Sequence, residues 1–158
     1  VAACNIPTPV WSGRSARDWL LHGATPQDVE AAAPDMDALS QFDTRGVILT
    51  AESATESDHD FVSRFFAPQV GVPEDPVTGS THCALGPYWH DRLGRSDLIG
   101  YQASSRGGTV RIHLPEPRAS SEARVHLLGA CCTMVQGTWQ APPNATNPDA
   151  EAHQSPSL

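Results

Sequence analysis

A short run of polar and small residues in the middle of the chain has the composition of a binding site. It reads Glu74-Asp75-Pro76-Val77-Thr78-Gly79-Ser80-Thr81, and it lies between a strand-like stretch and a helix-like one. A helix that begins here has free backbone N–H groups and the positive end of its dipole at Gly79 and Ser80. Because glycine lets a ligand approach those amides closely, we expect a small anion, such as a substrate carboxylate, to bind there.

The same residues also have a purely structural interpretation. Thr78 and Ser80 are good helix N-cap residues, and Asp75 before Pro76 is typical of a turn. Glu74 and Asp75 are adjacent carboxylates, of which one could act in acid/base chemistry if it were partly buried. On the residues alone, the binding and the structural interpretations have equal support.

His82 and Cys83 follow the run and raise the question of a metal or nucleophile site. Zinc would need two further ligands, and the other histidines downstream and upstream show no ligand spacing with this pair. We therefore expect no metal. The four cysteines, Cys4, Cys83, Cys131 and Cys132, contain no C-x-x-C pair, which favours buried free thiols. Cys83 falls about one turn into the helix, so we expect it to pack in the core.

The helix that would position this site is predicted to start at Ser80. Its apolar residues lie nearly all round it, which predicts a buried helix, and Pro87 predicts a kink or a weak first turn. These apolar residues are Cys83, Ala84, Leu85, Tyr88, Trp89 and Leu93. Tyr88 and Trp89 are expected in the core.

The other expected elements are one helix and a series of strands. Thr25, followed by Pro26 and Asp28, predicts a helix start, and Pro34 predicts its end near Ala33. The strands that follow the Glu74–Thr81 run have short connections, which favours antiparallel hairpins over β-α-β units. Residues 1–13 look like a linker, 14–140 like one domain, and 141–158 should be disordered. The expected strands are residues 46–51, 61–67, 98–104, 109–114, 124–128 and 130–135, with a turn at 106–108.

The composition limits the partners and cofactors. The chain has 158 residues and a net charge of −8, which argues against nucleic acid or an anionic membrane as partner. It has arginine but no lysine, which removes Schiff-base chemistry, a pyridoxal phosphate anchor and a P-loop. No stretch predicts a membrane span or a signal peptide, so we expect a cytoplasmic protein. The chain begins with Val1 rather than Met, as a fragment or a processed product would.

The run from Arg64 to Trp89, RFFAPQVGVPEDPVTGSTHCALGPYW, resembles the C-terminal half of the PhzF-like phenazine-biosynthesis family. Three other blocks match that family in order, and the resemblance extends over residues 19–139. These blocks are Thr44–Thr50 upstream, and Gln102–Gly108 and Val125–Gly129 downstream.

This resemblance implies an α+β fold like that of diaminopimelate epimerase, in which each half wraps an antiparallel β-sheet or barrel around one central helix. It implies that Asp75, Gly79 and Ser80 contact substrate, with Thr81 and His82 continuing the same site, and Asp75 remains as the candidate catalytic residue of this half. The reaction it implies is a proton relocation without a metal or an organic cofactor. The family's general acid/base glutamate lies in the N-terminal half near a C-G-H-A-T-like stretch, which this sequence lacks.

Two functional hypotheses follow. The first is an isomerase that acts on a small carboxylate-bearing metabolite, with this chain supplying the C-terminal half of the active site. The second is a catalytically incomplete half that self-associates, as a dimer or another non-enzymatic assembly. The expected partners are a carboxylate substrate and either the missing N-terminal half or a second copy of the chain.

Overall fold

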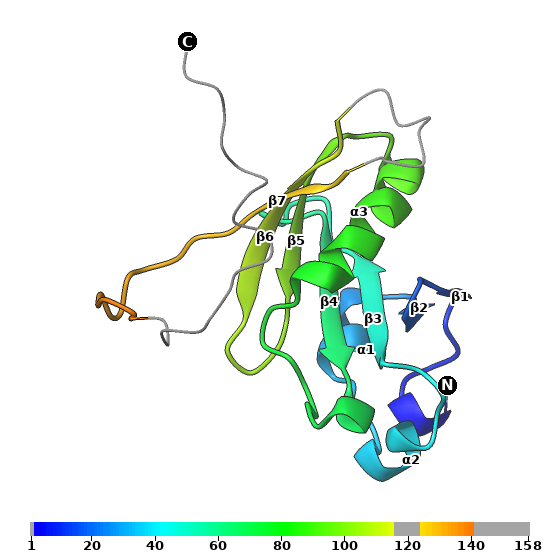
Figure 1. Cartoon of the computed structure of the whole chain (residues 1–158). Helices are drawn as coiled ribbons and strands as arrows, with labels where there is room; N and C mark the ends of the chain where they lie inside the picture. The colour runs from blue at the N-terminus through cyan, green and yellow to red at the C-terminus, as the bar shows by residue number, and fades with distance from the viewer. Residues whose placement is uncertain (1, 116–123, 141–158) are drawn as a thin grey trace.

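The computed structural model of the chain describes residues 2–115 and 124–140. The predicted disordered tail, 141–158, lies outside these residues. The described part forms one seven-stranded sheet with the order β1-β2-β3-β4-β5-β6-β7, with helices on both faces (Figure 1). The strands are β1 (Trp11–Arg14), β2 (Asp18–His22), β3 (Gly46–Glu52), β4 (Phe61–Phe66), β5 (Asp97–Gln102), β6 (Gly108–His113) and β7 (His126–Leu128). The helices are α1 (Pro26–Glu30), α2 (Met36–Ser40) and α3 (Gly79–Leu93), with short 3₁₀ turns η1 (Ala2–Cys4) and η2 (Pro68–Val70).

The sheet is mixed and open, which corrects the expectation of an antiparallel sheet or barrel. Strands β2 and β3 pair in parallel, as do β4 and β5, and the other neighbours are antiparallel. Each parallel pair is joined by a crossover that contains helix: α1 and α2 in the first, η2 and α3 in the second. The hairpin prediction concerned the strands after α3, and there β5 and β6 pair antiparallel, as do β6 and β7. The two parallel pairs lie earlier in the sheet, and each needs a long connection.

The two crossovers lie on opposite faces of the sheet. Residues of β3 and β4 alternate between them: Ile48 and Phe65 belong to the core under α3, whereas Leu49 and Phe66 belong to the core under α1 and α2. The right-handed rule for crossovers expects this arrangement, because β4 runs opposite to β2 while both connections move the same way across the sheet. Both faces of β3 are therefore covered, and its run of apolar residues is buried.

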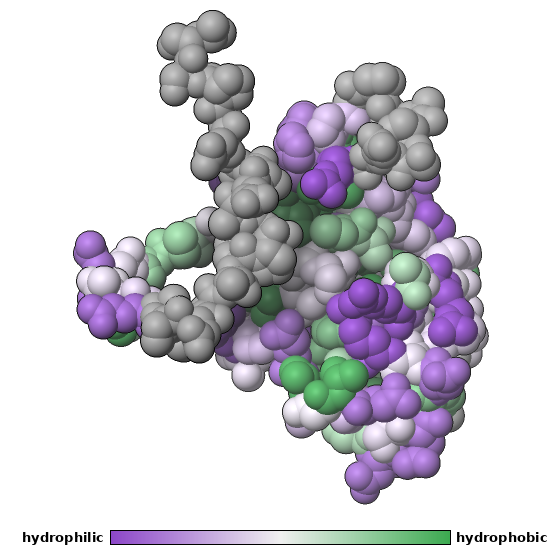
Figure 2. All heavy atoms as spheres, viewed as in Figure 1, coloured by the Kyte–Doolittle hydropathy of each residue, from purple (hydrophilic) through white to green (hydrophobic). Residues whose placement is uncertain are grey.

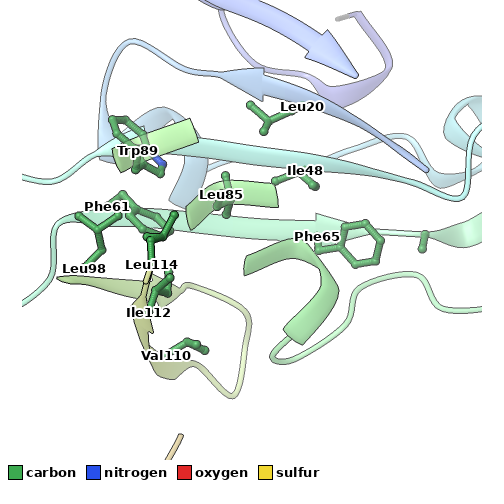
Figure 3. Close-up of a cluster of buried hydrophobic side chains, with 11 residues drawn as sticks. Leu20, Ile48, Phe61, Phe65, Leu85, Trp89, Leu98, Val110, Ile112 and Leu114 are labelled. Atoms are coloured by element: carbon green, nitrogen blue, oxygen red, sulfur yellow. The ribbon is translucent and has the colours of Figure 1, made fainter. Parts of the chain in front are cut away.

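Helix α3 buries one side only. Leu85 and Trp89 pack into the core with Phe61 and Leu98 from the sheet (Figure 3). Tyr88 packs against the same cluster from its edge. Cys83 lies on the opposite side and is exposed, so the predictions of a helix buried all round and of a buried Cys83 were wrong. The physical reason is that an open sheet contacts only one side of a helix that packs on it.

The described chain has more structure at its start than predicted, and less at its C-terminal end. At the start, Cys4 is buried and β1 begins at Trp11, so part of the segment interpreted as linker-like packs with the fold. At the other end, β7 is formed, but residues 130–135 form no strand beside it. The segment 129–140 extends away from the sheet (Figures 1 and 2). Cys131 and Cys132 are exposed on it, which corrects the expectation of buried thiols.

The remaining expected elements are formed close to their predicted bounds. α1 starts after Thr25 and ends at Glu30, three residues before the predicted end, and Gly46, Phe61 and Gly108 begin strands near the predicted positions. The predicted turn joins β5 to β6. Within the described residues, no helix is both long and apolar enough to cross a bilayer.

Candidate active site

The loop before α3 is held from one side by an ion pair. Arg64 on β4 binds Glu74 with two hydrogen bonds, Nε to Oε1 at 2.7 Å and Nη2 to Oε2 at 3.0 Å. Its Nη1 also donates to the carbonyl oxygens of Glu30 at 3.1 Å and Ala32 at 2.6 Å, at the C-terminal end of α1. The carboxylate of Glu74 is therefore used to hold the structure, and this leaves Asp75 as the carboxylate of the loop that can act on a ligand.

Asp75 is bound into a small network inside the loop. Its backbone N–H donates to the carbonyl of Phe65 at 3.1 Å. Its carboxylate Oδ2 accepts a hydrogen bond from the hydroxyl of Thr78 at 2.7 Å. The side chain of Gln102, which is fully buried, donates from Nε2 to the carbonyl of Asp75 and accepts the N–H of Thr78 on Oε1. These bonds fix where the Asp75 carboxylate lies relative to the start of α3.

The start of α3 is open. Thr78 is the N-cap residue, but its side chain makes no capping hydrogen bond, and no acidic residue lies in the first turn. The first amides of a helix have no carbonyl of their own helix to bind. Gly79 and Ser80 are both exposed, and a Cβ placed on Gly79 would meet only Leu127 Cδ1, at 3.8 Å. The two residues whose amides the sequence predicted as an anion site are thus exposed to solvent.

The guanidinium of Arg45 lies next to the start of α3, a contact that the sequence did not indicate. Its Nη1 donates to Ser80 Oγ at 3.0 Å, and its guanidinium forms a bidentate ion pair with Asp18. The guanidinium also lies over the ring of Phe65, 5.2 Å from its centroid. The hydrogen bond with Asp18 raises the pKa of Arg45, so the side chain is charged and fixed in place.

Thr81 and His82 lie on the buried side of α3, so their side chains do not reach solvent. The Nδ1 atom of His82 is 2.8 Å from the carbonyl of Thr78, and burial lowers the pKa of His82. The ring is therefore neutral near pH 7, with Nδ1 as the donor to that carbonyl. The structure thus brings Asp75, Gly79 and Ser80 together at the exposed helix start, while Thr81 and His82 support them from inside.

Ser104 supports the loop from the other side. Its hydroxyl donates to the carbonyl of Pro76 at 2.8 Å and accepts the N–H of Gly107 at 3.0 Å. Ser104 and Gln102 both belong to a sequence block that the resemblance included without assigning a role. The predicted turn at 106–108 therefore helps to hold the loop.

The described residues offer no obvious metal site, because no three His, Cys, Asp or Glu side chains among them are grouped as ligands. The chemistry that the arrangement itself can carry out is simpler. Open amides at a helix start can bind an anion, and a carboxylate beside them can exchange a proton.

Comparisons with known proteins show which family the chain resembles. A family model described as "Phenazine biosynthesis-like protein" matches residues 7–137. The "Uncharacterized isomerase BH0283" of Halalkalibacterium halodurans is 44% identical over 128 residues, which cover 81% of this chain and 46% of that protein. The "Uncharacterized isomerase PA3578" of Pseudomonas aeruginosa is 51% identical over 92 residues, 58% of this chain and 34% of that protein.

Solved structures show the same similarity. A PhzF-family phenazine biosynthesis protein from Enterococcus faecalis has a TM-score of 0.67 and 37% identity, covering 73% of this chain and 43% of that one. A PhzC/PhzF protein from Clostridium difficile has a TM-score of 0.70 and 34% identity, covering 85% and 49%. The chain therefore spans less than half the length of each of these relatives.

Proposed function

The chain belongs to the phenazine biosynthesis-like protein family, and from that premise we propose that it is part of an isomerase that moves a proton on a small carboxylate-bearing metabolite. Relatives that are named isomerases support the reaction class. One observation carries the proposal. The start of α3 has open amides at Gly79 and Ser80, and the Asp75 carboxylate is held beside it by Thr78.

In the proposed reaction, the substrate carboxylate binds the amides of Gly79 and Ser80 with Arg45 nearby. Asp75 exchanges the proton, so the chemistry needs neither a metal nor an organic cofactor. A second acid/base group would come from the remainder of a longer protein or from a second copy of the chain. In this proposal α3 is the central helix of one half, and its N-terminus points at the substrate between the two halves.

Binding at this site can be tested with the chain as it is. Anthranilate is a suitable probe, because it joins a carboxylate to a flat apolar ring, and aniline is its match without the carboxylate. We expect anthranilate, but not aniline, to shift the backbone amide NMR signals of Gly79 and Ser80. Equal shifts with both compounds, or shifts confined to other residues, would contradict the proposed anion site.

Chemistry is tested separately, by deuterium uptake from D₂O into a panel of small unsaturated carboxylates. We expect any uptake to be lost in Asp75→Asn, which keeps the size of the side chain and still accepts the hydrogen bond from Thr78. If Asp75→Asn exchanges as fast as the unchanged chain, Asp75 is not the group that moves the proton.

A second candidate function is self-association, favoured by the exposed apolar side chains near the C-terminal end of the described chain. Leu128, Met134, Val135 and Trp139 are 56%, 83%, 87% and 85% exposed. Surfaces of this kind commonly bind another protein surface. We propose a second copy as the partner, and sedimentation would then show a dimer that is lost when Met134, Val135 and Trp139 are all changed to Ser. A monomer at every concentration would contradict it.

A further inference from the structure

The orientation of the buried Gln102 carboxamide is determined by the backbone around it. The N–H of Thr78 can only donate, and it lies 2.8 Å from Gln102 Oε1. The carbonyl of Asp75 can only accept, and it lies 2.6 Å from Gln102 Nε2. The oxygen of the amide must therefore face Thr78 N–H and the nitrogen must face Asp75 C=O.

This orientation determines the direction of the next hydrogen bond. Gln102 Nε2 also lies 3.1 Å from the hydroxyl oxygen of Thr78, and an amide nitrogen can only donate. The Thr78 oxygen is thus an acceptor from Gln102. Its single proton is left for Asp75 Oδ2, at 2.7 Å. The chain of donors runs in one direction, from Gln102 to Thr78 to Asp75, and such chains strengthen each of their bonds.

We propose that Gln102 is a positioning residue for Asp75: it commits the Thr78 proton to Oδ2 and leaves Oδ1 as the oxygen through which Asp75 exchanges a proton. The role in catalysis rests on the proposed isomerase function, whereas the direction of the relay does not. Within the described part of the chain, Oδ1 has no hydrogen-bond partner.

The proposal specifies the proton's path. When Asp75 accepts a proton from a substrate carbon, the C–H bond breaks, its electron pair stays on the substrate, and the new O–H bond forms at Oδ1. The second acid/base group of the proposed function donates a proton to another carbon of the substrate, and Oδ1 then releases its own proton to solvent. Oδ2 keeps its bond to Thr78 throughout, so the carboxylate stays in place while Oδ1 accepts and releases the proton.

Gln102→Glu removes the donor of the relay, together with the bond from Gln102 Nε2 to the carbonyl of Asp75. Glutamate keeps the shape of the side chain, and one carboxylate oxygen can still accept the N–H of Thr78. The other oxygen cannot donate, so the Thr78 hydroxyl would turn to Glu and Asp75 would lose its donor. Thr78→Val separates the relay from support of the loop, because it removes the hydroxyl and keeps both bonds of Gln102 to the backbone. Thr78→Ser keeps the hydroxyl.

The readout is the carboxyl ¹³C NMR signal of Asp75 in the full chain at pH 7, which needs no substrate. We expect Thr78→Val and Gln102→Glu to shift it in the same direction, the double variant to add nothing further, and Thr78→Ser to keep the original signal. Gln41→Glu is the matched control, because Gln41 is exposed at the end of α2, away from this network.

Two results would overturn the relay: an Asp75 signal unchanged in Thr78→Val, or additive effects of the two substitutions in the double variant. If Gln102→Glu does not fold, the unchanged chain still gives a test. The Thr78 hydroxyl proton should exchange slowly and show a nuclear Overhauser effect to the Gln102 side-chain amide. A rapidly exchanging hydroxyl would reject the proposal, whether or not anthranilate binds.

Discussion

The helices α1 and α3 begin in opposite ways, although each belongs to a crossover between two parallel strands. At α1 the side chain of Thr25 accepts the N–H of Asp28, and the side chain of Asp28 accepts the N–H of Thr25, which is a complete capping box. At α3 the N-cap residue is also a threonine, but the hydroxyl of Thr78 binds Asp75 and Gln102 instead of the helix.

The difference shows that a threonine at the N-cap can either bind the helix amides or leave them open. α1 has five residues, and a helix that short depends on local capping and packing, so the side chain of Thr25 binds an amide of its first turn. α3 has fifteen residues and is held by its buried side, with Leu85 and Trp89 fully buried. It can leave its first amides open for a ligand without losing its place in the fold.

The largest effect is expected from a substitution that breaks the link between the two crossovers. Arg64 binds the C-terminal carbonyls of α1 and Glu74 in the loop before α3, so Arg64→Ala leaves Glu74 and those carbonyls without their partner. We expect a loss of about 3 kcal/mol in the free energy of unfolding, measured with urea.

Arg95→Ala is the control for this prediction. Arg95 pairs with Asp60, but its side chain is 54% exposed, so its loss should cost less than about 1 kcal/mol. Equal costs for the two substitutions would mean that Arg64 does not link the crossovers more strongly than a surface ion pair would.

The elements with local signals were the ones that the sequence predicted well. Thr25, Pro26 and Asp28 define the start of α1 within a few residues, and the apolar run after Gly46 marks β3. β1 and β2 were missed because they are short, and the burial of Leu20 and Leu21 depends on strands and helices that come later in the chain. Likewise, whether a sheet stays open or closes into a barrel depends on contacts between distant strands, which local patterns do not encode.

The candidate site was predictable in its loop but not in its surroundings. The free amides of Gly79 and Ser80 could be predicted, because the sequence indicates a helix that starts there after a turn. Arg45 and Gln102 come from other strands or their ends, and their contacts depend on the tertiary fold. Gln102 did carry one signal: it is a polar residue at an inward position of β5, where Leu98 and Gly100 are also buried. A buried amide in such a position needs partners, and here the loop provides them.

A substitution at the capped start of α1 should have an intermediate effect on stability. Thr25→Ala removes the capping box of α1, and we expect the free energy of unfolding to fall by about 1 kcal/mol. Thr25→Ser keeps a hydroxyl that can accept the same N–H and should lose only a few tenths of that amount. If both variants unfold at the same urea concentration as the unchanged chain, the cap contributes nothing and the contrast with α3 loses its energetic basis.

The smallest expected effect sharpens the contrast at the open helix, because stability and binding should change in opposite directions. Gly79→Ala has room for its methyl group and reduces the entropy of the unfolded chain, so we expect a gain of about 0.5 kcal/mol in the free energy of unfolding. We expect the added methyl group to obstruct a ligand at the neighbouring amides, so anthranilate should bind more weakly. Gly94→Ala at the other end of α3 is the control: Gly94 has φ +66°, so alanine there should lower stability by about 1 kcal/mol and leave binding unchanged. If Gly79→Ala instead gained stability with no loss of anthranilate binding, the ligand would not approach the amides at Gly79, and α3 would begin without a cap for a reason other than binding.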